Sequence, residues 1–532
     1  DVFATNLDVE GTGTVNLGGD FTGTAIRYNA DGTVIVATGN DVNSAITNNT
    51  GTDSQGTLTL NGSSTVTGQV GASGASLKEI NAGVAGSTST FNSNVYVTNL
   101  NMTGTGTVIL NSDLTGNVVA TGNNRGILTT TGLNKTITGN IGSSTSLDLN
   151  TLNIGSDTVL GNYSKTTING NVFAASTVLN NNNNDNGDLT TNSSELILAS
   201  GKNITSTITT ADNGKGILTL FGGTQTVTGQ VGTGGVGGLS LEKVSSGATG
   251  ATSTFVNNVY ANTVENTGTG ATTFQDNVVA TNVNVNAGTS TFQDNLTATT
   301  TTISTGTGNF NTVSGTTTSN LEFTDNGTAN LNRGLTGDVT TTSDGEGKLN
   351  LVGSNNQTVT GQVGDSINKL AEVNAGANGA TSTFTDDVYT TDITVGNGIV
   401  NFEDNVVATT TTIGSGTANF NTTSGTTTTD IVFSNTGTAN LLTGLTGDIN
   451  FAGKNATVNI SDGMGILGSV QTLASNNTGI LNYNGDGTIS GNIGSNNHGI
   501  KELNINTNNE QNTPNGVLVT NNPALGRELY AD

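Results

Sequence analysis

The sequence predicts an all-β protein, a long right-handed parallel β-helix with coils of about 18–19 residues. Three observations predict this fold. A phenylalanine-centred phrase recurs every 18 or 19 residues, a seven-residue phrase recurs five times, and Val, Ile, Leu and Phe alternate with Thr, as in strands. We expect the β-helix to cover residues 1–505. Residues 506–532, which contain both prolines, are expected to form a C-terminal cap or linker.

The finer repeat has the pattern Phe-x-x-(Asn/Asp)-(Val/Leu) and begins at Phe91, Phe255, Phe274, Phe292, Phe384 and Phe402. Within runs the steps are 274−255 = 19, 292−274 = 18 and 402−384 = 18, and Phe310 and Phe420 follow after 18 more. This period is too short for a propeller blade or a helical repeat and suits one coil of a β-solenoid. We therefore expect stacked phenylalanines about 4.8 Å apart, with Phe292 buried between Phe274 and Phe310.

The longer repeat reads TVTGQVG at Thr65–Gly71, Thr226–Gly232 and Thr358–Gly364, with variants at Thr136–Gly142 and Thr488–Gly494. Its spacing predicts coils of unequal length, because 226−136 = 90 is five eighteens whereas 358−226 = 132 is no multiple of 18. Longer loops are expected near LKEI from Leu77 and LAEV from Leu370. A left-handed solenoid needs an apolar residue at each sixth position, and Asn286 and Ser304 break that rule, which favours a right-handed helix.

Composition limits the function classes. The net charge is −25, which opposes binding to nucleic acid or to an anionic membrane surface. No run approaches the roughly 18 apolar residues of a membrane helix, so this segment is not expected to insert into a membrane. The chain has no Cys, which fits a secreted protein. Dividing 532 by 18 gives about thirty coils, and a narrow solenoid core of this kind needs few apolar residues.

The sequence predicts no catalytic site. The lone histidine, His498, lies in a turn-like stretch, SNNHGIKEL, and is expected to be an exposed turn residue. Nucleophile-elbow, zinc and phosphate-loop motifs are absent. Parallel β-helices often cleave polysaccharides, and the adjacent carboxylates Asp386 and Asp387 leave such an enzyme as a remote alternative. No Arg is followed by Lys two positions later, as in those enzymes.

Four aspartates are weak candidates for binding Ca²⁺. They lie two residues after repeat phenylalanines, at Asp276, Asp294, Asp386 and Asp404. Stacked coils would place successive carboxylates about 4.8 Å apart, and Ca²⁺, which binds oxygen ligands, would relieve their repulsion. A solvated acidic corner without metal is the competing interpretation. Asn277 and Asn295 are expected to form an amide ladder, and Asn181–Asp188 a surface loop.

The phrases GTLTLNGSSTVTGQVG, KLAEVNAGANGATSTF and TGTVILNSDLTGNVV resemble the passenger domains of rickettsial surface autotransporters, the surface cell antigens that include outer membrane protein B. The resemblance covers most of Gly11–Asn506. It implies an extracellular, non-enzymatic virulence protein at the bacterial cell surface that adheres to a host-cell receptor or the extracellular matrix and forms part of the surface coat. The C-terminal end, NNPALGRELYAD, does not match the family's outer-membrane barrel strands. A self-assembling S-layer or filament subunit is the alternative function.

Overall fold

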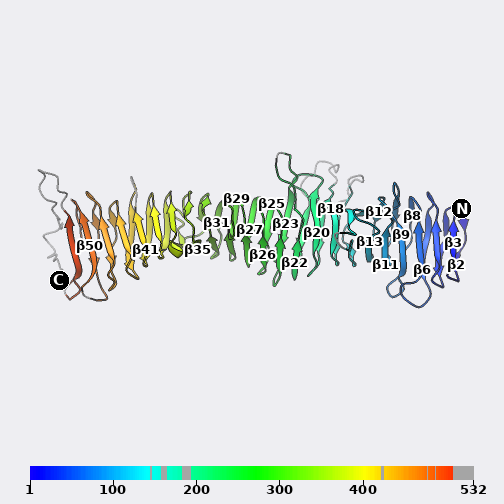
Figure 1. Ribbon diagram of the computed structural model, residues 1–532, viewed down its shortest axis with the longest axis horizontal. Coiled ribbons are helices and arrows are strands. Elements are labelled where there is room, and N and C mark those ends of the chain that lie inside the picture. Colours follow the sequence, from blue (N-terminus) through cyan, green and yellow to red (C-terminus); the bar gives the residue numbers. More distant parts are fainter. Residues whose placement is uncertain are drawn as a thin grey trace. The chain divides into compact units, whose positions relative to one another are not determined.

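The computed structural model describes residues 1–143, 146–156, 164–181, 193–235, 237–420, 425–475, 477–485, 487–495 and 497–506. The protein is a β-solenoid of about 24 turns, in which parallel strands stack in two sheets, and this confirms the predicted fold class (Figure 1). Within the described residues the only helical element is one 3-10 turn, η1 (Ala377–Gly379). The predicted cap lies outside the described residues except for Asn506, and the predicted loop except for Asn181.

The chain forms two compact units, Asp1–Thr281 and Asn282–Asp532, and β27 (Val278–Val285) contains the division between them. The strands of the first unit are β1 (Val2–Phe3), β2 (Asn6–Val9), β3 (Thr14–Leu17), β4 (Phe21–Tyr28), β5 (Thr33–Val36), β6 (Val42–Asn48), β7 (Thr57–Leu60), β8 (Ser64–Val66), β9 (Leu77–Ala82), β10 (Thr88–Phe91), β11 (Val95–Met102), β12 (Thr107–Leu110), β13 (Leu114–Ala120), β14 (Ile127–Thr130), β15 (Lys135–Ile137), β16 (Leu149–Ile154), β17 (Lys165–Ile168), β18 (Val172–Leu179), β19 (Glu195–Leu198), β20 (Ile204–Thr210), β21 (Ile217–Leu220), β22 (Thr224–Val227), β23 (Leu241–Ser246), β24 (Thr252–Phe255), β25 (Val259–Asn266) and β26 (Ala271–Phe274). Those of the second are β28 (Thr289–Phe292), β29 (Leu296–Ile303), β30 (Thr307–Phe310), β31 (Thr317–Phe323), β32 (Thr328–Leu331), β33 (Leu335–Thr336), β34 (Val339–Thr341), β35 (Glu346–Leu351), β36 (Gln357–Val359), β37 (Leu370–Ala375), β38 (Thr381–Phe384), β39 (Val388–Val395), β40 (Ile399–Phe402), β41 (Val406–Ile413), β42 (Thr417–Phe420), β43 (Thr427–Phe433), β44 (Thr438–Leu441), β45 (Leu445–Thr446), β46 (Ile449–Asn450), β47 (Thr457–Ile460), β48 (Ile466–Leu467), β49 (Val470–Gln471), β50 (Thr478–Asn484) and β51 (Ile500–Asn506).

A regular turn consists of one four-residue strand and one eight-residue strand, as β40 and β41 show. Strand β40 pairs in parallel with β38 and β42, and β41 pairs with β39 and β43. The pairing of β41 with β43 shifts register between Val407 and Thr410, which divides the long strand β41 into two segments. Together with the short strand β40, one turn therefore contains three straight segments around the core. Alternate residues face inward, and Val400 and Phe402 are at most 1% exposed.

Phenylalanines stack in the core as the 18-residue period predicts. In the second unit Phe402 lies between Phe384 and Phe420, with ring centroids 5.4 and 5.3 Å away and nearly parallel ring planes. Phe292 is 1% exposed and stacks on Phe310 at 5.4 Å, while in the first unit Phe274 stacks on Phe255 at 5.0 Å. Stacked phenylalanine rings and smaller inward residues therefore form the narrow core.

The phenylalanine repeats do not share one column, as a simple 18-residue stack would require. Phe310 continues through Leu331 to Leu351, whereas Phe384 continues through Val359 to Leu335. Leu331 and Leu335 occupy different segments of the same turn. The phenylalanine repeat therefore lies in one segment before the TVTGQVG phrase at Thr358–Gly364 and in another segment after it. A glycine is needed at the corner of this phrase, because a Cβ on Gly361 would clash with the backbone oxygen of Gly337.

Turn length varies more than the repeats predict. Paired residues are 402−384 = 18 apart in the shortest turns and 210−179 = 31 apart between β18 and β20. The estimate of about thirty coils was therefore too high. Extra residues 71–76 and 364–369 immediately precede the LKEI and LAEV phrases, but the phrases themselves are the buried strands β9 and β37.

Asp and Asn side chains at the corners hold the backbone of the next turn. The Oδ1 atoms of Asp31 and Asp41 accept hydrogen bonds from the N–H groups of Gly56 (3.0 Å) and Thr65 (2.7 Å). Asn side chains also bond to one another: Asn277 donates to Asn258 at 2.9 Å. A longer amide ladder, with Nδ2–Oδ1 distances of 2.6–2.9 Å, joins Asn401, Asn419, Asn440, Asn459, Asn482 and Asn504.

Phe402→Ala should destabilise the second unit locally by about 3–5 kcal/mol, because it removes a ring from the middle of a stack and leaves a cavity. Amide hydrogen exchange in β38, β40 and β42 would measure the loss of protection. Phe221→Ala is the control, since that ring is 66% exposed and its removal should change the free energy of unfolding by no more than about 0.5 kcal/mol. Equal exchange in both variants would show that the stack is not a source of stability.

Acid should weaken the stacking of turns at Asp31. The N–H of Gly56, and then Lys78, hold the pKa of this carboxyl below its usual value. A lowered folded-state pKa means that the stabilisation is present above about pH 4 and is lost as pH falls through the folded-state pKa. We expect the urea midpoint of unfolding, followed by circular dichroism, to fall between about pH 5 and 2. Asp31→Asn should make that fall shallower, and an unchanged pH dependence would contradict this role.

Candidate functional site

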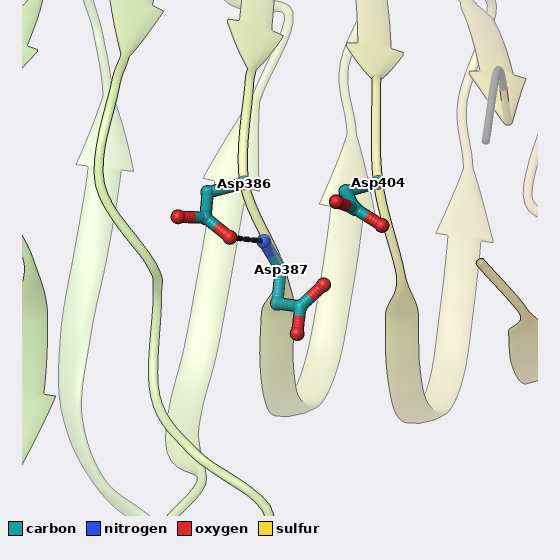
Figure 2. A group of neighbouring side chains, drawn as sticks. All are labelled: Asp386, Asp387 and Asp404. Atoms are coloured by element: carbon teal, nitrogen blue, oxygen red, sulfur yellow. Dashed lines mark hydrogen bonds between the residues drawn. The ribbon is translucent and has the colours of Figure 1, made fainter. Parts of the chain in front are cut away.

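Three carboxylates meet at one outer corner of the second unit. Asp386 and Asp387 lie between β38 and β39, and Asp404 occupies the matching corner between β40 and β41 of the next turn (Figure 2). Because Val388 pairs with Val406, the preceding corner residues are brought side by side. One oxygen from each of the three side chains lies within 4.8 Å of the other two.

The hydrogen bonds of this cluster engage some of its oxygens and leave others open. Asp387 Oδ1 accepts from Asn405 Nδ2 at 2.7 Å, and its Oδ2 accepts from the Tyr389 hydroxyl at 3.1 Å. One oxygen of Asp386 accepts the Asp387 N–H at 2.8 Å, and one of Asp404 accepts the Asn405 N–H at 2.9 Å. The second oxygens of Asp386 and Asp404 have no hydrogen bond to the described residues.

The electrostatic field at this corner is negative. The pKa of Tyr389 is raised, first by partial burial of the hydroxyl and then by its hydrogen bond to Asp387. The charges of Asp387, Asp404 and Asp365 raise it further. Asp365 comes from the loop before β37 and thus extends the negative field onto the preceding turn. The corner therefore favours cations.

Sequence reasoning identified part of this cluster. Asp386 and Asp404 do lie together, and Asp387 had been considered only as a partner of Asp386 in catalysis. Asp276 belongs to the first unit, where its Oδ1 accepts from Asn277 Nδ2 at 2.7 Å, and Asp294 belongs to the second. Over the described ranges of the chain, no group of three potential ligands forms around either of them.

The cluster can supply three carboxylates to a divalent cation. Ca²⁺ takes six to eight oxygen ligands, so the cluster would need water to complete the shell. Asp386 is exposed and the other two are half-buried, which leaves space for that water. These residues therefore fit a weak, exchangeable Ca²⁺ site better than an enclosed one.

A groove with a volume of about 380 Å³ begins beside the cluster. Its lining is Gly425, Thr426, Thr427, Gly444, Leu445, Thr446, Gly465, Ile466, Leu467, Thr488 and Ser490. Three successive turns place glycine at this corner, and the missing side chains open the groove. Sequence reasoning missed it, although the glycines were visible, because the lengths of the intervening turns decide which glycines become neighbours.

His498 is not part of either feature. It lies in a tight turn in which its N–H donates to Ser495 O at 2.9 Å, as the turn-like sequence predicts. The side chain is half-buried, however, and not fully exposed, and its Nδ1 is buried without a hydrogen-bond partner among the described residues. The three carboxylates of the acidic cluster lie at corners of earlier turns.

Comparison with protein-family models, with curated proteins and with solved structures finds no match to the chain. Within the part of the chain that the structure describes, no helix has the length and apolar character needed to span a bilayer. The geometry of the solenoid and of its acidic corner is thus the basis for assigning a function.

Millimolar Ca²⁺ should bind the acidic cluster and slightly raise the melting temperature, because the cation relieves repulsion among three carboxylates. Isothermal titration calorimetry would measure the binding and thermal unfolding the shift. Both effects should be lost in Asp386→Asn/Asp404→Asn, whereas Asp276→Asn should retain them. If that double variant kept the full calcium response, the cluster would not be the cation site.

Proposed function

We propose that this chain is a non-enzymatic, extracellular protein of the bacterial cell surface, in the manner of an autotransporter passenger, and that it acts in adhesion to host cells. The observation that supports this proposal is the combination, within each unit, of continuous parallel pairing with turns of very different length. Turns with paired residues 18 and 31 positions apart keep the same parallel pairing. Described insertions, such as residues 71–76 and 364–369, lie at corners between strands, where they are available to a partner.

This arrangement separates stability from recognition. Buried Val, Leu, Ile and Phe hold successive turns together, and the loops contribute little to that core. Loops at the corners can therefore vary in length and sequence at a small free-energy cost, which suits an adhesin that must match a receptor or the extracellular matrix. A scaffold of this kind presents several loops to a large partner at once.

One loop illustrates how a contact residue is presented. Asp365 Oδ1 accepts the N–H groups of Ile367 and Asn368 at 2.7 and 2.8 Å, which fixes the loop before β37. The Ile367 side chain at its tip is 79% exposed. An apolar side chain on an ordered loop loses little conformational entropy on binding, which favours a role in a protein–protein contact.

A polysaccharide-cleaving enzyme is a weaker alternative. Glycoside hydrolysis needs one carboxyl group that stays protonated in a secluded environment beside an ionised partner. Asp386 is exposed on an outer corner, and Asp387 and Asp404 are half-buried there. No histidine is near enough in the fold to share their proton among the described residues, because the lone His498 belongs to a later turn.

A self-assembling S-layer or filament subunit is the second candidate, and the outer face formed by β38, β40, β42, β44, β47 and β50 favours it. Outward residues on these six strands are Thr, Asn and Ile, including the Asn401–Asn482 ladder, and none of them is charged. A chain of net charge −25 resists association of its copies, so an uncharged face is where contact costs least. Divalent cations should promote such packing.

Labelled purified protein should bind host cells saturably, and Ile367→Ser should reduce that binding severalfold without changing the circular dichroism spectrum. Thr409→Ser, a mild change on a strand away from this loop, serves as the control. Deletion of Leu77–Gly86 is unsuitable because Leu77 and Ile80 are fully buried. Absence of cell binding together with concentration-dependent assembly in light scattering would instead support the structural subunit.

A further inference from the structure

The groove beside the acidic cluster is a short, open depression on the surface of the second unit. Corner glycines Gly425, Gly444 and Gly465 come from three successive turns and line it. Strands at this corner already pair with their neighbours, as the bond from Ile466 N–H to Thr488 O at 2.8 Å shows, so the groove offers hydroxyl groups and apolar surface more than free backbone groups. Its occupant is therefore held mainly by its side chains.

One end of the groove is acidic. A Cβ added to Gly425 would lie 2.6 Å from Asn405 Oδ1 and 2.9 Å from Asp404 Oδ1, so the lining and the cluster are in contact. Thr426 donates its N–H to Asn405 Oδ1 at 2.7 Å, which fixes this junction. Since one carboxylate oxygen from each of Asp386, Asp387 and Asp404 lies within 4.8 Å of the other two, a cation that enters this end meets all three.

The groove also contains an exposed apolar side chain. Leu467 lines it and is 65% exposed, in contrast to its neighbour Ile466, which is 2% exposed, and Thr488 and Ser490 of the next turn complete the lining. Three turn-to-turn steps separate the turn of Asp404 from that of Leu467, which is about 14 Å along the solenoid axis at about 4.8 Å per step. Leu467 lies in the column of Val407 and is thus offset from Asp404 by three residues along the turn. An extended peptide advances about 3.3 Å per residue, so residues i and i+4 span this axial separation and face the same side.

We propose that the groove binds an extended peptide segment of a partner protein that carries a Lys or Arg four residues away from a large apolar residue. The cationic side chain enters the Asp386, Asp387 and Asp404 cluster, and the apolar side chain covers Leu467. The position of the acidic cluster decides which end of the groove receives the cationic side chain. This inference rests on the proposed adhesive role, because the bound segment would belong to a host-cell receptor.

Charge complementarity selects this occupant. The net charge of −25 disfavours acidic ligands everywhere on the chain, and the cluster concentrates negative charge at one end of an open groove. A small polyamine would satisfy the carboxylates but not Leu467. An apolar peptide would cover Leu467 and leave the carboxylates solvated. Only a ligand with both groups contacts the acidic cluster and Leu467 together.

Fluorescence polarisation with the full chain and a fluorescein-labelled Lys-Ser-Thr-Ser-Leu pentapeptide tests the proposal. We expect saturable binding that weakens as salt concentration rises. Asp386→Asn/Asp387→Asn/Asp404→Asn should weaken it at least tenfold, and Leu467→Ser about threefold or more. Glu79→Gln/Glu322→Gln/Asp392→Asn, which lowers the net negative charge equally at other places, should bind within twofold of the unchanged protein. Circular dichroism confirms folding of each variant.

Peptide variants complete the test. Replacing Lys by acetyl-lysine, or moving Leu two residues closer, should weaken binding at least fivefold, and Ca²⁺ should compete with the peptide. If the cluster variant and the charge-matched control lost peptide affinity equally, the binding would be non-specific electrostatic attraction and the proposal would be overturned. A lack of saturable binding at millimolar peptide would overturn it as well. Retained host-cell binding by the cluster variant would overturn this groove as the receptor site while leaving the adhesive function intact.

Discussion

Parallel pairing of each turn with the next is the constraint on which this structure depends. Every inward residue must meet an inward residue of the turn before and the turn after, at the spacing of paired strands. Phe402 satisfies this between Phe384 and Phe420, and Val406 satisfies it beside Val388. Because a single core residue supports two neighbours, a cavity at one turn weakens its contacts on both sides. The same constraint explains why a chain with only 32% hydrophobic residues folds.

The pairing that builds the core also creates the surface features. Residues at one corner are repeated at nearly the same place in the next turn, so like residues gather there. Stacked Asn form an amide ladder, which is favourable, and stacked Asp form a cluster whose repulsion is only partly relieved by Asn405 and Tyr389. Stacked glycines leave a groove. Acidic cluster and groove are thus consequences of one geometry at successive turns of the same corner.

Variation in turn length makes the surface of this regular scaffold irregular. Loops such as the one that presents Ile367 are inserted between strands whose pairing is unchanged. The TVTGQVG phrase does something different: it supplies Val359 and Val363 to two segments across the Gly361 corner and shifts the phenylalanine repeat to another segment. The fold therefore accommodates loops of different length. It also allows the phenylalanine repeat to move from one strand segment to another while the parallel pairing is kept.

The sequence by itself determined the fold class, the 18-residue spacing and the stacking of Phe292 on Phe310, because these depend on local periodicity. It also placed Asp386 and Asp404 in one corner, since equal spacing implies stacking. Only the tertiary structure decided that Asp387 completes the cluster, that Phe310 and Phe384 lie in different columns, and that Gly425, Gly444 and Gly465 line one groove. Those outcomes depend on the lengths of intervening turns, which decide the neighbours of each residue and cannot be read from a repeat that is only nearly periodic.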